Sequence, residues 1–116
     1  MAAVTIYQKP SCTTCRQVYA ALVAAGIDMD SVDYFIDPLS PAKLRDLIRK
    51  MGVPVQTLLR TKDPAYAELN LGSGTRSDEE LIRLMIEHPG LLQRPIVEKG
   101  SRAILARPPE RLKEIL

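Results

Sequence analysis

The spacing of apolar residues changes twice in the first third of the chain. Residues 3–7 form a short, mostly apolar run typical of a strand, and residues 15–25 repeat apolar positions at helical spacing until Gly26. Residues 32–36 alternate apolar and other side chains, which predicts a second strand. Strand, helix and strand in this order predict a βαβ unit with parallel strands.

Helical patterns dominate the next part of the chain. Ser40 and Pro41 have the residue types of an N-cap and a first helical position, and Ser77 with Glu80 has the spacing of a capping box. A glycine-containing loop is expected at residues 72–74. The helical segments expected from these patterns are 41–51, 55–59, 65–69 and 78–88.

Strand patterns return near the C-terminus. Apolar runs at 96–97 and 103–106 flank a turn that contains Gly100, as in a β-hairpin, and Pro108 begins a last helix. The order βαβ, helical segment, ββα is that of a thioredoxin/glutaredoxin-like α/β fold. Pro95 lies just before the third strand, where this fold usually carries a cis-proline, so Pro95 is a candidate for that role.

Length and composition favour one domain and exclude several classes of partner. With 116 residues and 46% hydrophobic residues, the chain can bury a core of its own, so we expect a single domain over 1–116 with a helical insertion at roughly 39–92. A net charge of +2 is too small to indicate nucleic acid or an anionic membrane, and no apolar run approaches the ~20 residues of a membrane span. We expect a monomer.

The cysteines are the strongest indication of chemistry. Cys12 and Cys15 are the only two, and they lie in the turn between the first strand and the following helix. Backbone N–H groups at a helix N-terminus lower a thiol pKa from ~8.5 to roughly 3.5–7.5, which favours a thiolate, and Cys12 is better placed for this than Cys15. The alternative is that both are small apolar residues of the core.

The expected compartment agrees with reactive thiols. Met1, Ala2 and Ala3 lack the charged start of a secretory signal, so we expect a cytoplasmic protein, in which paired cysteines are reactive or metal-binding more often than disulfide-bonded. A zinc site needs about four ligands, and His88 is the only histidine. We therefore expect no metal and no bound cofactor, and a packing or capping role for His88.

Three segments, in this order, resemble the ArsC/Spx family: residues 10–16, 58–60 and 87–97. The resemblance covers nearly the whole chain and implies a thioredoxin-like fold and a glutaredoxin-linked arsenate reductase that serves arsenic detoxification. It also implies that Cys12 is the nucleophile and that three arginines surround it and bind the oxyanion. Guanidinium groups suit this role because they stay charged and offer paired N–H donors. The matching arginines are Arg60, Arg94 and Arg107.

Two residues depart from the reductase pattern and keep alternatives open. Gln8 stands where such reductases often have a histidine thought to help ionise the nucleophile, and Cys15 stands where many of them lack a cysteine. If Cys15 resolves Cys12 as a disulfide, thioredoxin could be the reductant instead of glutathione with glutaredoxin. Cys15 also matches Spx-like redox-sensing regulators that bind RNA polymerase, whereas Arg107 favours the enzyme. A third possibility is a related thiol oxidoreductase with another substrate.

Overall fold

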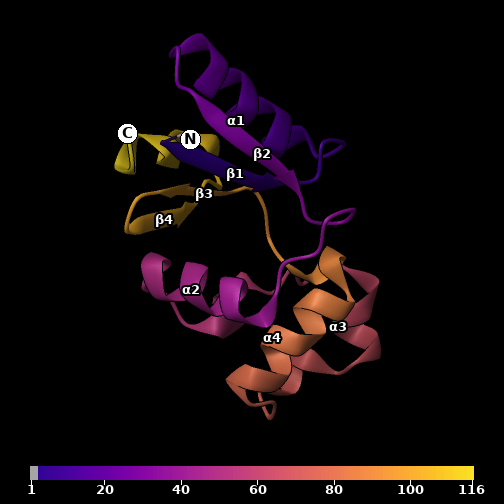
Figure 1. The fold of residues 1–116 in the computed structure, drawn as a ribbon. Helices are drawn as coiled ribbons and strands as arrows, with labels where there is room; N and C mark the ends of the chain where they lie inside the picture. The colour runs from indigo at the N-terminus through magenta and orange to yellow at the C-terminus, as the bar shows by residue number, and fades with distance from the viewer. Residues whose placement is uncertain (1–2) are drawn as a thin grey trace. The chain divides into compact units, whose positions relative to one another are not determined.

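The computed structural model describes residues 3–116 and divides the chain into two compact units. The sheet unit comprises the chain up to Asp37 together with Arg94–Leu116, and the helical unit comprises Pro38–Gln93 (Figure 1). The helical unit differs by one residue at each end from the expected insertion. That all 116 residues act as one domain stays a prediction. Met1 and Ala2, on which the expectation about a secretory signal partly rests, lie outside the described residues.

The sheet unit has the βαβ–ββα order of a thioredoxin-like fold, which confirms the expected fold class. Its sheet has the strand order β2-β1-β3-β4, in which β1 pairs parallel with β2 and antiparallel with β3, and β3 pairs antiparallel with β4. The final element is a 3₁₀ helix, η4, where we expected an α-helix. The elements are β1 (Val4–Gln8), α1 (Thr13–Ala24), β2 (Met29–Asp33), β3 (Ile96–Lys99), β4 (Arg102–Leu105) and η4 (Pro109–Glu114).

The core of the sheet unit lies where α1 and η4 pack against one face of the sheet (Figure 1). Val4 and Ile6, alternate residues of β1, both point to this face, as expected for a strand with one face in the core. The buried apolar cluster consists of Val4, Ile6, Val18, Leu22, Val97, Ile104, Ala106, Leu112 and Ile115. This packing holds α1 against the sheet through Val18 and Leu22.

The second strand was predicted too late in the chain. The structure ends β2 at Asp33, because the Asp33 side chain accepts a hydrogen bond from the Phe35 N–H at 3.0 Å and its carbonyl accepts from Asp37 at 2.8 Å. An aspartate that bonds the backbone two residues on favours a turn. Tyr34 and Phe35 therefore leave the sheet.

The helical unit contains the helices expected from its capping residues. Ser40 Oγ accepts the Lys43 N–H at 3.0 Å and Ser77 Oγ accepts the Glu80 N–H at 3.2 Å, which confirms where two helices begin. Part of the expected 72–74 loop is a 3₁₀ turn. The elements are α2 (Pro41–Met51), η1 (Val55–Leu58), α3 (Pro64–Glu68), η2 (Leu71–Ser73), α4 (Asp78–Glu87) and η3 (Pro89–Leu91).

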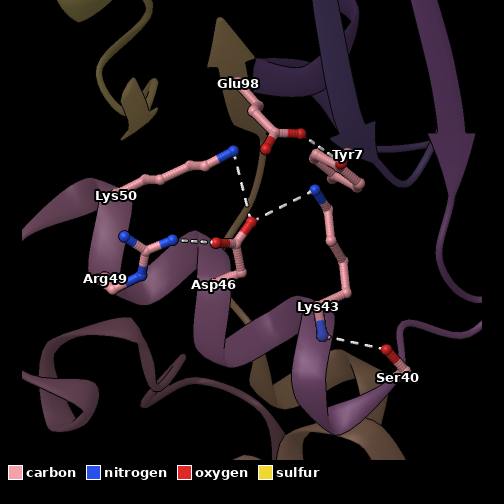
Figure 2. Close-up of polar contacts among 7 residues, drawn as sticks. All are labelled: Tyr7, Ser40, Lys43, Asp46, Arg49, Lys50 and Glu98. Carbon is pink, nitrogen blue, oxygen red and sulfur yellow. Dashed lines mark hydrogen bonds and ion pairs between the residues drawn. The ribbon is translucent and has the colours of Figure 1, made fainter. Parts of the chain in front are cut away.

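Charged side chains of α2 pair with neighbours one turn away. Asp46 forms ion pairs with Lys43 at 3.7 Å, with Lys50 at 3.4 Å and with Arg49 (Figure 2). The hydrogen bonds from Arg49, followed by those from Lys50, hold the pKa of the Asp46 carboxyl below its usual range. These contacts have the i,i+3 and i,i+4 spacing of pairs along one helix surface. Within residues 3–116, no helix is long and apolar enough to cross a membrane.

Candidate active site

Cys12 is the N-cap of α1. Its Sγ accepts the Cys15 N–H at 3.4 Å, its N–H donates to the Lys9 carbonyl at 2.9 Å, and its carbonyl accepts the Arg16 N–H at 3.0 Å. The helix begins at Thr13, two residues before the predicted start, because the cysteine itself caps it. The sulfur thus lies at the positive end of the helix dipole, as expected for a thiolate site.

The two cysteines are both free thiols, but their environments differ. Burial raises the pKa of Cys12, yet hydrogen bonds from the Cys15 side chain and backbone and the charge of Arg94 outweigh burial, so the pKa lies below its ordinary value. Burial, followed by the hydrogen bond to Cys12, raises the pKa of Cys15 to about 12. Cys12 is therefore the more acidic of the two thiols, and Cys15 is the thiol that donates a hydrogen bond to the Cys12 sulfur.

Arg94 lies against Cys12 within the sheet unit. Its guanidinium hydrogen-bonds to the Cys12 sulfur and to the Tyr34 phenol, and its Cζ lies 5.5 Å from the centre of the Phe35 ring. Only 6% of the residue is exposed. A buried arginine needs such partners, because an unpaired charge is costly to remove from water. The Arg94–Pro95 peptide bond is cis.

Arg107 follows β4 and contacts the backbone of Arg94. Its Nη1 donates to the Arg94 carbonyl at 3.1 Å, while the residue as a whole is exposed. The Arg107–Pro108 bond is a second cis peptide bond, which we did not predict. The structure thus brings Cys12, Cys15 and Arg94 together, and Arg107 contacts the Arg94 backbone; a place for the Arg107 guanidinium beside Cys12 stays a prediction.

Arg60 belongs to the helical unit. It follows η1, and its N–H donates to the Leu91 carbonyl at 2.6 Å, next to the bridge between Leu59 and Leu92. Its expected place beside Cys12 stays a prediction.

Gln8, in the position of the missing histidine, is 5% exposed and donates from Nε2 to Ser31 Oγ at 2.7 Å. It therefore links β1 to β2. The pKa of Cys12 is lowered by hydrogen bonds from Cys15 and by the positive charge of Arg94.

Tyr34 and Phe35 are site residues that the sequence did not reveal, because we assigned them to a strand. One local indication was present: Asp33 has the residue type that begins an Asx-turn, and such a turn directs the next side chains away from the sheet.

His88 is the C-cap of α4 and is exposed, so a capping position rather than a packing role is observed. Among the side chains of residues 3–116, no three of the types His, Cys, Asp and Glu gather as a metal site would require.

A sequence model described as the ArsC family matches residues 7–115. The chain belongs to the ArsC family. It is 42% identical over 113 residues to an arsenate reductase of Rhizobium meliloti (strain 1021), covering 97% of this chain and 81% of that protein. It is also 38% identical over 114 residues to the uncharacterized protein YfgD of Escherichia coli (strain K12), covering 97% of this chain and 96% of that protein.

A solved structure supports the same membership. An arsenate reductase from Vibrio cholerae matches this ArsC-family chain with a TM-score of 0.94 at 38% sequence identity, covering 99% of this chain and 98% of the other. The predicted resemblance and fold class are therefore confirmed, and the chain is arsenate reductase-like.

Proposed function

We propose that this ArsC-family protein reduces arsenate to arsenite in the cytoplasm, with the Cys12 thiolate as the nucleophile. The observation that carries the proposal is the Cys12 sulfur at the N-terminus of α1, with the guanidinium of Arg94 against it. Relatives named arsenate reductase support arsenate as the proposed substrate. Arsenic detoxification would be the consequence.

Electrostatics explain why arginines would be needed. Arsenate is an anion at neutral pH, and a thiolate that approaches it meets repulsion between like charges. Arg94 partly neutralises the thiolate, while Arg107, whose side chain is exposed beyond its contact with Arg94, would bind the oxyanion together with Arg60. The S–As bond forms as one arsenate oxygen leaves as water.

Reduction of As(V) to As(III) takes two electrons, which come from two thiols that end as one disulfide. In the first route a glutathione thiolate attacks the Cys12 adduct, arsenite leaves, and glutaredoxin reduces the resulting Cys12–glutathione disulfide. In the second route Cys15 supplies the second thiol and thioredoxin reduces a Cys12–Cys15 disulfide. Burial is the largest cause of the raised pKa of Cys15 and disfavours its thiolate, so we propose glutathione as the faster reductant.

The test is arsenite production by the purified protein with glutathione and glutaredoxin, and separately with thioredoxin and its reductase. Wild type is compared with Cys12→Ser, Cys15→Ser and Arg107→Ala, and Arg83→Ala, on the exposed face of α4, is the matched control. We expect Cys12→Ser to abolish turnover, Arg107→Ala to reduce it, and Arg83→Ala to leave it unchanged. Cys15→Ser should retain turnover with glutathione and lose it with thioredoxin.

Absence of arsenite with both reductants would overturn the proposal. One observation then favours a redox-sensing regulator as the second candidate: the buried Cys15 thiol is hydrogen-bonded to the more acidic Cys12, and neighbouring thiols of this kind can exchange into a disulfide. Binding to RNA polymerase that depends on the oxidation state of Cys12 and Cys15 would support it. If neither arsenite production nor binding to RNA polymerase is observed, the remaining alternative is a thiol oxidoreductase that acts on another substrate.

A further inference from the structure

Two aromatic residues in the turn after β2, Tyr34 and Phe35, contact the Arg94 guanidinium that acts on Cys12. Tyr34 is 3% exposed and Arg94 is 6% exposed, and the Arg94 guanidinium donates a hydrogen bond to the Tyr34 oxygen. Phe35 lies under the same guanidinium, with 5.5 Å between Cζ and the ring centre. The five N–H donors of an arginine can serve the phenol and the Cys12 sulfur together.

The two aromatic rings support each other. Their centres are 5.1 Å apart and their planes differ by 21°, so Tyr34 and Phe35 are stacked. The Nζ of Lys9 lies 4.8 Å from the Phe35 ring centre, and the Lys9 carbonyl accepts the Cys12 N–H. The Phe35 ring therefore contacts the side chain of Lys9, which leads into the Cys12 turn, as well as Arg94.

We propose that Tyr34 and Phe35 are positioning residues that hold the Arg94 guanidinium against the Cys12 sulfur and so set the fraction of Cys12 present as thiolate. The inference deepens the proposed function and rests on Cys12 as its nucleophile. Neither aromatic residue is proposed to touch the substrate, since both act through Arg94.

The physical reason is the long, flexible arginine side chain. A guanidinium free to move would spend part of its time far from the sulfur, and the attraction between charges falls with distance. The cation–π contact with Phe35 and the hydrogen bond to Tyr34 restrict that freedom before substrate arrives. Burial raises the pKa of Tyr34, so the phenol stays neutral where Cys12 titrates and adds no negative charge beside it.

The charged and titratable groups around Cys12 come from several elements of the sheet unit. Cys15 lies on α1, Arg94 precedes β3, and Tyr34 follows β2. Lys9, at the end of β1, reaches the same aromatic surface through Phe35. A change at Tyr34 or Phe35 should thus reach Cys12 through Arg94, whereas a change at an exposed tyrosine should not.

The experiment is the pH profile of Cys12 alkylation by iodoacetamide in the full chain, with mass spectrometry to confirm one adduct on Cys12. We expect Tyr34→Phe and Phe35→Leu each to raise the midpoint by about half a pH unit or more, about a threefold fall in the thiolate-to-thiol ratio. Tyr19→Phe, on the exposed side of α1, is the matched control and should keep the wild-type midpoint.

A double-variant comparison tests the route of the effect. In an Arg94→Gln background, Tyr34→Phe should cause no further shift, because the guanidinium that it positions is gone. An unchanged midpoint in folded Tyr34→Phe, or the same shift with and without Arg94, would overturn the inference. Tyr34→Phe removes one oxygen and decides the matter alone if Phe35→Leu does not fold.

The alkylation profile requires no arsenate, so the two proposals fail separately. A protein that shows the midpoint shifts but produces no arsenite contradicts the proposed function and keeps the positioning roles of Tyr34 and Phe35. If the wild type reduces arsenate but the Tyr34 and Phe35 variants keep the wild-type midpoint, the proposed function stands and the positioning roles are contradicted.

Discussion

A buried arginine of the sheet unit and an exposed arginine of the helical unit use their charges in different ways. In the sheet unit, Arg94 is 6% exposed, and its partners Cys12 and Tyr34 lie far from it along the chain. In the helical unit, Arg45 pairs with Glu79 at 3.1 Å, and their side chains are 51% and 62% exposed. One arginine is confined in a protein environment, and the other is largely in water.

The difference teaches which charges can change chemistry. A hydrogen bond to a charged group that is shielded from water contributes about 1.5–3 kcal/mol, whereas an exposed ion pair contributes about 0.2–1 kcal/mol. Only the first is large enough to move a thiol pKa substantially. The buried arginine therefore belongs to the site, and the exposed pairs belong to the surface.

Replacing Arg94 should have the largest effect. Arg94→Gln removes the positive charge beside Cys12, so arsenite production at neutral pH should fall about tenfold to a hundredfold, in line with the loss of about 1.5–3 kcal/mol. Turnover with glutathione and glutaredoxin measures the loss. Activity within twofold of wild type would show that the buried Arg94 affects the chemistry no more than an exposed arginine does.

Gly90→Ala tests whether the helical unit also depends on one contact between distant residues. A Cβ at Gly90 would overlap the carboxylate of Asp63, which caps α3 by accepting the Ala65 N–H at 3.1 Å. We expect a loss of about 1–3 kcal/mol in the free energy of unfolding, measured with urea. In an Asp63→Ser background, with a shorter capping side chain, the same change should cost less; an equal cost would contradict this explanation.

Cys15→Ala separates the two hydrogen bonds that Cys15 gives to Cys12. The backbone N–H remains but the thiol donor is lost, so the thiolate is less favoured and the pKa of Cys12 should rise, by roughly one unit or less. Alkylation at pH 7 should slow accordingly. Cys15→Ser keeps a hydroxyl donor and should shift the profile less. A fall in the Cys12 pKa in the alanine variant would contradict this account.

Arg45→Gln should have the smallest effect. The pair with Glu79 is exposed, so the free energy of unfolding should change by less than about 1 kcal/mol, and the difference should shrink further in concentrated salt. Urea unfolding at two salt concentrations measures it. A salt-independent loss comparable to that of Gly90→Ala would show that exposure is a poor guide to the value of a charge pair here.

Most of the fold was predictable because its strongest determinants are local. Ser40, Ser77 and Gly52 mark helix ends through contacts within one turn, and Gly100 adopts the positive φ of 61° that the hairpin turn uses. The strand β2 was misplaced for a physical reason. It is an edge strand with a polar sequence, and its register comes from pairing Val4 with Met29 rather than from its own pattern.

The site was predictable only in part. The Cys12 turn could be inferred because a helix N-cap depends on residues within three positions of it. Tyr34 and Phe35 could not, since the alternation around them resembles a strand until the Asp33 turn is known. Family resemblance pointed to Arg94 and Arg107, but only the structure showed that one is buried and the other exposed.

The sequence by itself determined where α2 and α4 begin and where the hairpin turns, and that Cys12 lies at the start of a helix. These features depend on hydrogen bonds between residues three or four apart, which form wherever the residue types allow. The tertiary structure decided that Arg94, Tyr34, Phe35 and Cys12 meet, and that the two cysteines differ in acidity. Burial and the charge of a distant residue set those pKa values, and both arise only once the chain has folded.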